Sequence, residues 1–535
     1  MAAGLYFSER GVRPLGRGGA FTAGADDLGA IWYNPAGVYD AGSQLLLDVS
    51  WLNFTTEYTR RSILEQRDPN TGEVVSEWEQ TFPTVEGSTA VIPIPTVAGS
   101  YQVHPQWVVA LGFEAPYSAI PSYPETVAGE PSPSRYSLIT MDGSMLAIIG
   151  LWAAWAPSDE WRLGAGLQLL VGSFVTTTMF SACVPDRFFC APEQPEWDTL
   201  TQLTAGPLIT PSGNLGVKWL PHRQWRVGAA FQLPYWVNAS AEVRSRLPSS
   251  AVFETVEQQG ADASVSFELP WSARLGVQYS PWDPLVVELD GSVEGWSMHD
   301  DITITPENVE LRNLPGFPDP MRVAEQRIPR NFTESFSVRL GAELELDVAD
   351  DMALGLRTGA SYETSAIPAE YMSVLTMDMP KVTVGLGASL GVGAWWFDAV
   401  YAHVFGFDVE VDPADARLPL LNPLEANVAA PHYVNGGSYS ARANVVGIGL
   451  RYQFEIAEGD TVDPDPSASP GEDSEAGDAA AAAPDGAEDE GADERGDDED
   501  GDEAGDEDEA DDEDGDEDSD EAVGDDGEAD GEEDD

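Results

Sequence analysis

Period-two alternation of apolar and polar residues constrains this chain more than any other feature. It begins near Gln44 and recurs in many segments separated by turn residues. Residues 161–174 place Trp, Leu, Ala and Val on one face and Arg, Gly and Gln on the other. Residues 225–233, 271–279 and 336–346 repeat this pattern. Such segments predict two-faced β-strands, and therefore an all-β fold.

The lengths of the connections distinguish a barrel from a sandwich. We expect short connections at about 104–106, 156–160, 220–224, 280–284, 349–351 and 391–394. We expect long polar or Pro-rich connections near 60–90, 116–135, 179–203, 245–262, 299–331, 364–378 and 406–438. Because short and long connections alternate, the sequence predicts a fourteen-stranded antiparallel transmembrane β-barrel, with tight turns on one side and large loops on the other.

The physics of the lipid bilayer agrees with this prediction. A closed barrel satisfies every backbone N–H and C=O internally, which lipid requires. Tryptophans at many strand ends, Trp107, Trp161, Trp225 and Trp395 among them, suit an aromatic girdle at the headgroups, although core packing in a soluble barrel remains an alternative. The most apolar stretch, Met145 to Ala156, has the length of a barrel strand and is too short for a membrane helix.

Acidic charge is concentrated at the C-terminus. The chain has 94 Asp and Glu against 26 Lys and Arg, and 42 of the acids follow Phe454 with Arg495 as the only base there. This balance excludes a nucleic-acid-binding surface. Residues 455–535 are predicted to be a disordered periplasmic tail with no identified partner, and a tether for basic proteins or cations is the alternative.

Cysteine and histidine content bears on location and catalysis. Cys183 and Cys190 are close enough for a disulfide in an oxidising compartment, with two free thiols as the alternative. The five histidines match no hydrolase, nucleotide or zinc motif, so we expect no enzyme activity, no cofactor and no metal site. His403 is the only histidine expected on a barrel wall, where a girdle position is favoured over catalysis.

The first residues depart from the strand pattern. Residues 1–42 are rich in Gly and Ala, lack the basic and apolar regions of a secretory signal, and are too apolar for a free tail. They contain GRGGAF, with Gly16, Gly18 and Gly19, and WYNPAG, with Asn34, Pro35 and Ala36. We expect three parts: a plug over 1–42, a barrel over 43–454 and the tail over 455–535.

The stretch GLYFSERGVRPLGRGGAFTAGADDLGAIWYNPAG resembles the hatch segment of the outer-membrane long-chain fatty-acid transporter family (FadL-like). Further similarity lies in residues 212–232, 269–281, 295–297 and 436–454, so the resemblance covers about residues 2–454. It implies a fourteen-stranded barrel with an N-terminal hatch. It also implies passive uptake of hydrophobic small molecules, either long-chain fatty acids or aromatic hydrocarbons, with lateral exit through the wall.

The resemblance also implies roles for particular residues. The lateral opening is expected at a kink in the third strand, Trp107 to Tyr117, where Gly112 and Pro116 weaken a ladder, unless Pro116 merely begins the loop. The Asn34, Pro35 and Ala36 bend is expected to be either a pivot of the hatch or a structural turn.

Arginines predicted to face the lumen are candidates for binding a carboxylate ligand, since Arg forms bidentate pairs with carboxylates. The candidates are Arg162, Arg226, Arg274, Arg339, Arg357 and Arg451. Acidic residues predicted to face the same lumen are Glu288, Asp290, Glu343 and Glu345. A space-filling Arg–Glu network is the favoured alternative to ligand binding.

These features predict a channel in the bacterial outer membrane whose partners are a hydrophobic ligand, the lipid bilayer and the barrel-assembly machinery, which would read the terminal Phe454. Two other functions stay open. One is a structural or adhesive barrel that binds partners through its long loops. The other is a membrane-embedded lipid hydrolase that uses His403.

Overall fold

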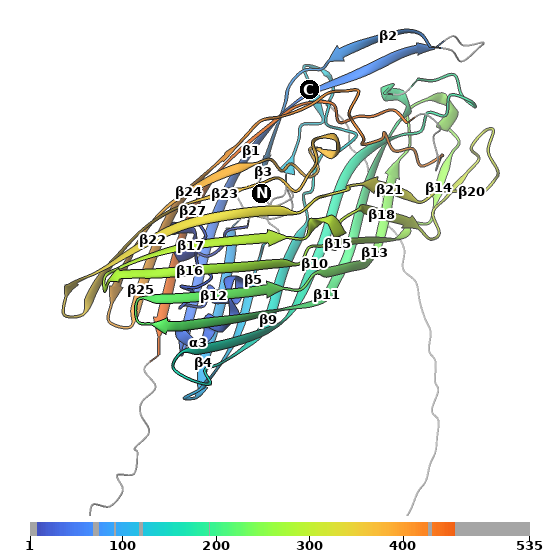
Figure 1. The fold of residues 1–535 in the computed structure, drawn as a ribbon. Helices are drawn as coiled ribbons and strands as arrows, with labels where there is room; N and C mark the ends of the chain where they lie inside the picture. The colour runs from blue at the N-terminus through green and yellow to red at the C-terminus, as the bar shows by residue number, and fades with distance from the viewer. Residues whose placement is uncertain are drawn as a thin grey trace, which may run out of the picture. The chain divides into compact units, whose positions relative to one another are not determined.

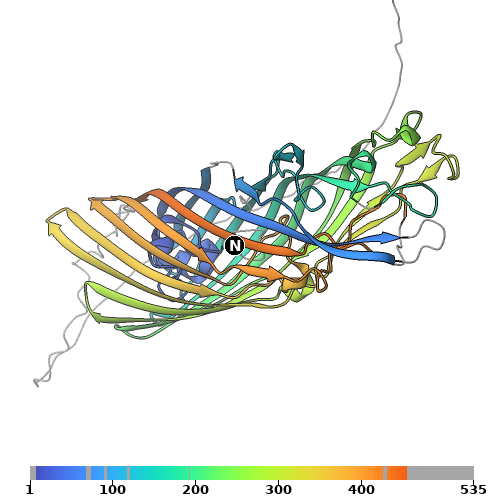
Figure 2. The same cartoon turned by 90° about the horizontal axis from the view of Figure 1, so that it is seen from above.

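The computed structural model describes residues 8–67, 74–89, 93–116, 121–191, 193–425 and 431–454. The predicted disordered tail, residues 455–535, lies outside the described residues. In the described part, long strands form one wall and short helices near the N-terminus lie within it (Figures 1 and 2). The helices of the described residues are too short to cross a membrane.

Fourteen antiparallel strands close into a barrel, as predicted. Each strand pairs with the next, and the last pairs with the first from Gln44 opposite Gln453 to Arg60 opposite Gly437. The barrel strands are β1 (Gln44–Arg67), β4 (Pro93–His104), β5 (Trp107–Glu114), β9 (Met145–Trp155), β10 (Trp161–Ser181), β11 (Asp198–His222), β12 (Trp225–Gln232), β16 (Ser272–Trp282), β17 (Leu285–Glu294), β22 (Ser335–Ala349), β23 (Met352–Glu363), β24 (Lys381–Val392), β25 (Trp395–Gly406) and β27 (Gly437–Gln453).

Further strands lie in the long connections. They are β2 (Val74–Thr81), β3 (Val85–Thr89), β6 (Pro121–Ser122), β7 (Thr126–Val127), β8 (Glu130–Pro131), β13 (Tyr235–Arg246), β14 (Glu257–Gln259), β15 (Asp262–Leu269), β18 (Asp301–Pro306), β19 (Glu310–Arg312), β20 (Met321–Arg322), β21 (Gln326–Pro329) and β26 (Val409–Val411). The short helices are α1 (Val12–Gly16), α2 (Ala30–Tyr33), η1 (Pro35–Gly37), α3 (Val38–Ala41), η2 (Pro195–Trp197), η3 (Ala251–Phe253), η4 (Trp296–Met298) and η5 (Ala369–Tyr371).

The predicted loop boundaries need correction on the long-loop side. Residues 60–67, 198–203, 301–306 and 326–329, expected in loops, are strands. Residues 60–67 are the end of β1, which pairs there with β2. The other three segments belong to an extension in which β10, β11, β13, β15, β18 and β21 pair in that order. Their polar composition resembles that of loops because their outer face meets water rather than lipid.

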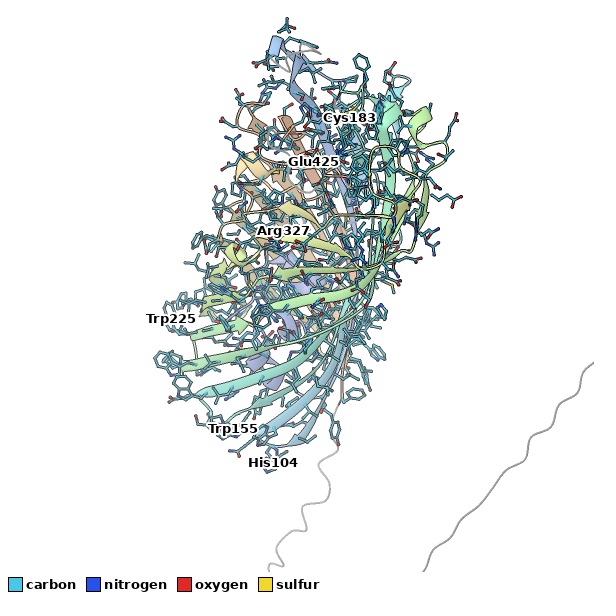
Figure 3. The ribbon with its side chains drawn as sticks, turned by 90° about the vertical axis from the view of Figure 1, so that its right-hand side faces the viewer. His104, Trp155, Cys183, Trp225, Arg327 and Glu425 are labelled. Carbon is cyan, nitrogen blue, oxygen red and sulfur yellow. A yellow bond between two sulfur atoms is a disulfide. The ribbon has the colours of Figure 1, made fainter. Side chains whose placement is uncertain are left out.

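Aromatic pairs mark the end of the barrel that carries the short turns. Trp107 stacks on Trp155 with ring centroids 5.7 Å apart, and Trp395 packs on Tyr452 at 4.4 Å. Trp155 and Trp225 lie toward this end in Figure 3, whereas Cys183 and Glu425 lie toward the other. This arrangement suits an aromatic girdle at one lipid boundary.

The apolar face of the strands points outward at one end of the barrel and inward at the other. On β12 the apolar residues Phe231 and the following Leu233 are exposed on the outside. After Pro234, the next apolar residues of the same alternation, Tyr235 and Val237 on β13, are buried. The lower wall is therefore apolar outside and polar inside, as in lipid, whereas the upper extension is apolar inside and polar outside.

The N-terminal residues 8–42 lie inside the lower half of the barrel, and nearly all of them are buried (Figure 2). Helix α1 lies against β23, β24 and β25, while η1 lies against β10 and β11. Glycines of the wall permit this close approach. A side chain at Gly359 would collide with the backbone of Arg17, and one at Gly216 with Asn34.

We expect Gly359→Val to displace the N-terminal residues, because the added side chain overpacks the contact with Arg17 at a cost of about 1–3 kcal/mol. Trypsin should then cut faster after Arg10 and Arg17 in the detergent-solubilised barrel. Gly291→Val is the matched control, since a Cβ there has its nearest neighbour, Ser337 O, at 3.9 Å. Equal cleavage of both variants would contradict the packing described.

Candidate functional site

Charged residues fill the lower lumen, where the sequence predicted an arginine-lined site. Arg357 donates to Glu343 at 2.6 Å, to Asp398 at 3.0 Å and to Ser389 at 2.8 Å. Arg451 donates to Asp398 at 2.9 Å. Both guanidinium groups are thus neutralised by acids from neighbouring strands, which offsets the cost of burying charge.

The other predicted arginines bind the N-terminal residues. Arg339 donates to Glu9 at 3.2 Å, and Arg274 donates to the carbonyl of Trp32 at 2.7 Å. The remaining two bind acids at greater exposure, Arg162 with Asp40 at 3.1 Å and Arg226 with Asp26 at 3.3 Å. All six arginines therefore have protein partners. This geometry favours a network that holds residues 8–42 in the lumen, and a ligand role for these arginines stays a prediction.

Predicted lumen acids bind the same segment. Asp290 accepts from the backbone N–H of Phe21 and Thr22, each at 2.9 Å. Glu288 accepts from the N–H of Ala23 at 2.6 Å. Glu343 binds Arg13 at 3.0 Å. Glu345 differs, because it lies exposed near the short-turn end of β22.

The predicted hatch residues are tightly packed. Asn34 accepts from Ala36 N–H at 3.1 Å, which caps η1 at Pro35, and donates to Thr22 O at 2.8 Å and Val217 O at 3.1 Å. Gly16 lies against Gly387, and a side chain at Gly18 would collide with the backbone at Gly359 and Ala360. A side chain at Gly19 would meet the side chains of Glu9 and Arg339. The tripeptide is a rigid turn bound to the wall in this conformation, and its role as a pivot remains to be tested.

The third strand is shorter than predicted, and a lateral opening near Gly112 and Pro116 stays a prediction. Strand β5 ends at Glu114, and Tyr117 lies outside the described residues. Gly112 pairs with Ala98 on one side and Gly150 on the other, without a register shift. The ladder is therefore intact at Gly112. Pro116 follows the strand, and its carbonyl accepts from Arg10 at 3.0 Å.

An apolar cavity lies in the extension beyond the membrane-spanning strands. It holds about 1220 Å³ not filled by atoms, including the part open to solvent. Strands β10, β11, β13, β18 and β21 form one side, and residues 373–375 and 418–424 face them. Apolar lining residues include Phe180, Leu203, Val243, Phe253, Ile304, Leu311, Ile328, Leu375, Leu418 and Leu424.

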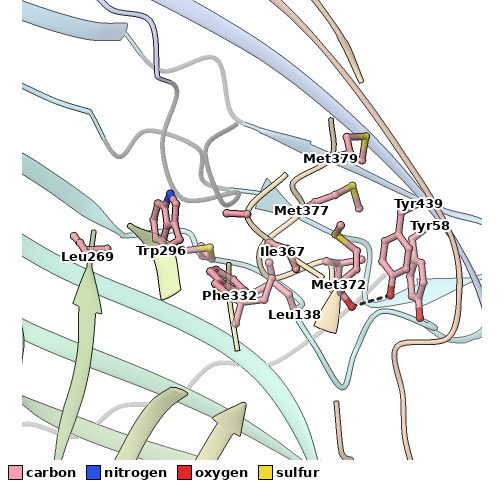
Figure 4. Close-up of a cluster of buried hydrophobic side chains, with 14 of the residues drawn as sticks. Tyr58, Leu138, Leu269, Trp296, Phe332, Ile367, Met372, Met377, Met379 and Tyr439 are labelled. Carbon is pink, nitrogen blue, oxygen red and sulfur yellow. Dashed lines mark hydrogen bonds between the residues drawn. The ribbon is translucent and has the colours of Figure 1, made fainter. Parts of the chain in front are cut away.

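The connection after β23 forms the floor of this region. The sequence predicted a long connection near 364–378. Residues 364–380 fold inward, because Ile367, Met372, Met377 and Met379 join a buried apolar cluster (Figure 4). Tyr439 donates to the carbonyl of Met372 at 3.3 Å. Methionine side chains adapt easily to new neighbours. This connection therefore fills the lumen between the cavity and the N-terminal residues.

Arg330 lines the cavity, and nothing in the sequence marked it as a site residue. Its guanidinium is fully buried, and none of its three nitrogens has a hydrogen-bond partner among the described residues. Burial lowers its pKa to about 10, so the group stays cationic at neutral pH. Burial and the charge of Arg330 lower the pKa of His299 to about 3, so this neighbour is neutral. The guanidinium carbon lies 5.7 Å from the centroid of the Phe332 ring, and no acid of the described residues pairs with it. The cavity thus contains a buried cation that lacks a counterion in the described part of the chain.

Ion pairs and a disulfide organise the loops around the cavity. Buried Arg60 of β1 binds Glu193, which also contacts His432. Arg135 binds Asp198 at 2.9 Å. Cys183 and Cys190 form a disulfide, with Cα atoms 5.8 Å apart. Distant connections are thereby tied together above the barrel.

The histidine considered for catalysis lies on β25. His403 Nδ1 lies 2.8 Å from Asn444 Oδ1, and its ring packs on Phe405 with centroids 4.2 Å apart. These contacts are those of a wall residue next to an aromatic side chain. They provide no serine nucleophile for a hydrolytic pair.

Glu193 makes the loop arrangement sensitive to acid. Burial opposes ionisation, but Arg60 and His432 outweigh it and lower the pKa of Glu193 to about 2, below its ordinary 4.5. Its stabilising contribution is therefore complete above pH 4.5 and is lost as the pH falls toward 2.

We expect Glu193→Gln to destabilise the loops by roughly 3–5 kcal/mol, because Arg60 keeps its buried charge without a counterion. Hydrogen exchange at residues 182–191 and 431–435 should rise in the variant at pH 7, and in the unmodified protein only under strong acid. Glu79→Gln, which removes an exposed partner of Arg61, should leave exchange unchanged. Unchanged hydrogen exchange in Glu193→Gln would show that the Arg60–Glu193 ion pair does not order these loops.

Comparisons with known proteins agree with this architecture. A FadL homologue of Pseudomonas aeruginosa matches with a TM-score of 0.61 and 15% identity, covering 84% of this chain and 100% of that one. The Pseudomonas putida toluene transporter TodX matches at 0.53 and 13%, covering 84% and 100%. The CymD monoaromatic hydrocarbon channel matches at 0.51 and 15%, covering 84% and 98%. At these identities the structures show a shared fold. No curated protein sequence matches the chain.

The sequence profile of one family covers the whole described barrel. The family is described as outer membrane protein transport protein (OMPP1/FadL/TodX), and it matches residues 1–454. The match confirms the resemblance found in the hatch-like segment, and with the barrel fold it indicates a bacterial outer-membrane protein. The chain therefore belongs to the OMPP1/FadL/TodX family of outer-membrane transport proteins.

Proposed function

We propose that this barrel takes up hydrophobic small molecules from outside the cell by diffusion, with the apolar cavity as the first binding site. The observation that carries the proposal is that the apolar lining includes the buried guanidinium of Arg330, which has no hydrogen-bond partner among the described residues. An aliphatic chain would bury its surface against residues such as Leu203 and Val243. A carboxylate would supply the hydrogen-bond acceptors that Arg330 lacks.

The combination of an apolar lining and a buried guanidinium favours long-chain fatty acids over neutral aromatic hydrocarbons as substrates. Toluene or a similar ring would occupy the cavity but leave the guanidinium uncompensated, at a cost of desolvation. A fatty acid satisfies both parts of the site. TodX and CymD, which their descriptions assign to toluene and monoaromatic hydrocarbons, share the fold, so the choice of substrate rests on the cavity residues.

The N-terminal residues are proposed to gate the route. Among the described residues, 8–42 and the connection 364–380 contribute buried side chains to the lumen below the cavity, which supports a route that is closed in this conformation. We propose that ligand binding shifts the hatch about the Asn34, Pro35 and Ala36 turn, with Gly16, Gly18 and Gly19 permitting the rearrangement. The substrate then leaves sideways through the wall.

Replacing Arg330 tests the proposal. In cells lacking their own transporter, Arg330→Met should reduce saturable uptake of labelled oleate by about ten-fold or more, as expected for loss of a charged hydrogen bond worth roughly 1.5–3 kcal/mol. Uptake of toluene should stay unchanged. Arg327→Met is the matched control, because this nearby β21 arginine is 65% exposed.

Three outcomes distinguish the candidates. Equal loss of oleate and toluene uptake would contradict the carboxylate assignment while leaving a hydrophobic channel. Unchanged oleate uptake in Arg330→Met would also contradict the assignment of Arg330 to the substrate carboxylate. No uptake of either compound by a correctly inserted wild-type barrel would refute transport of these compounds and favour the adhesive role.

A further inference from the structure

Ser373 is a second buried polar residue of the apolar cavity. It is 2% exposed, and its hydroxyl has no hydrogen-bond partner among the described residues. It lines the same cavity as Arg330, but it comes from the connection between β23 and β24, whereas Arg330 directly follows β21. A hydroxyl buried without a partner costs free energy, so its presence in a native structure requires an explanation.

Alternation along the connection directs Ser373 into the cavity. Met372 and Val374 are buried in the inner apolar cluster, and the residues that follow each of them, Ser373 and Leu375, line the cavity. An apolar side chain at position 373 would therefore suit the lining, as leucine does at 375. A hydroxyl at this position is unfavourable unless a polar group faces it.

Hydrogen bonds fix the backbone on either side of this position. Asn435 Nδ2 donates to the carbonyl of Glu370 at 2.8 Å and to that of Met372 at 3.0 Å. The hydroxyl of Tyr439 also donates to the Met372 carbonyl, at 3.3 Å (Figure 4). The backbone that carries Ser373 is therefore in place before a ligand binds, which lowers the entropic cost of binding through this side chain.

The segments that carry Ser373 and Arg330 lie side by side. The N–H of Thr333 donates to the carbonyl of Ala366 at 2.8 Å, which joins the chain after β21 to the connection. Phe332 belongs to the same buried cluster as side chains of the connection (Figure 4). Two polar side chains that lack partners among the described residues thus face one apolar cavity from neighbouring segments.

A carboxylate suits both groups. Arg330 can bind it through a bidentate pair of N–H donors. A carboxylate has about four acceptor positions, so it can accept a further hydrogen bond from a hydroxyl. The proton of the Ser373 hydroxyl is available for this bond, because no acceptor of the described residues takes it.

We propose that Ser373 is a substrate-binding residue whose hydroxyl donates to the carboxylate that pairs with Arg330. This inference rests on the proposed function, and it gives the connection 364–380 a binding role in addition to filling the lumen. The headgroup is bound from two segments of the cavity. The site thereby selects a free fatty acid over its ester, because an ester has no negative charge to pair with Arg330 and fewer acceptor positions for Ser373.

Removing the hydroxyl tests the proposal. In the detergent-solubilised full chain, Ser373→Ala should weaken binding of labelled oleate about ten-fold, as expected for loss of a hydrogen bond to a charged group. Binding of methyl oleate and of toluene should stay nearly unchanged, because neither carries a carboxylate. The unliganded variant should melt at the same or a higher temperature, because a buried hydroxyl without a partner has been removed.

Thr376→Val is the matched control. Thr376 lies on the same connection, is 1% exposed and has a hydroxyl without a partner among the described residues, but it does not line the cavity. This variant should bind oleate like the wild type. Equal weakening of oleate binding in Thr376→Val and Ser373→Ala would show that the connection acts only through its packing, and would overturn the proposal.

A double variant tests whether the two residues bind one headgroup. Ser373→Ala should weaken oleate binding far less in an Arg330→Met background than in the wild type, since residues that share a partner are not additive. Additive losses would overturn the shared headgroup. If Arg330→Met loses oleate binding while Ser373→Ala keeps it, this inference fails and the proposed function stands. If the wild type binds no oleate, the proposed function fails and this inference with it.

Discussion

Closure of the hydrogen-bond ladder between β1 and β27 is the constraint on which the rest of this structure depends. Lipid offers no partner for a free strand edge, so fourteen strands must return to the first. A closed wall with an apolar outside leaves a polar inside, and burying that polar surface requires partners. The N-terminal residues supply them: their backbone N–H groups bind Asp290 and Glu288, and Arg13 and Arg17 bind Glu343. The charged lumen and its filling segment are therefore one consequence of membrane insertion.

The reversal of polarity above the membrane gives the protein its candidate binding cavity. Apolar residues keep the same alternation across Pro234 and across Pro270, where Trp271 lies outward below and Leu269 is buried above. The strand breaks at each proline, and there the apolar series changes from facing lipid to facing the interior. The extension thus becomes apolar inside and polar outside, as a water-exposed sheet must be.

The sequence predicted the fold more completely than the site. Short turns, strand number and the packed N-terminal segment follow from local alternation and composition, and the structure agrees with the first two in detail. The predicted arginines do face the lumen, but every one of them has a protein partner. Arg330 lay in a long predicted connection, and nothing in the sequence was a reason to select it. The third-strand kink came from the resemblance and not from a pairing pattern. Pairing depends on which strand edges meet, and the composition of one strand does not specify the strand opposite it.

By itself the sequence determined that this chain forms strands, how many cross the membrane and which turns join them, because alternation, turn residues and strand length are local properties. It also determined that one face of each strand must be apolar. The tertiary structure alone decided whether that face meets lipid or the cavity, because the apolar series changes sides at the break around Pro234 while its composition stays the same. It likewise decided which cation remains unpaired, since Arg330 and Arg357 differ only in the acids that the closed barrel brings to them. Charge compensation depends on distance across the fold, which residue order along one strand does not specify.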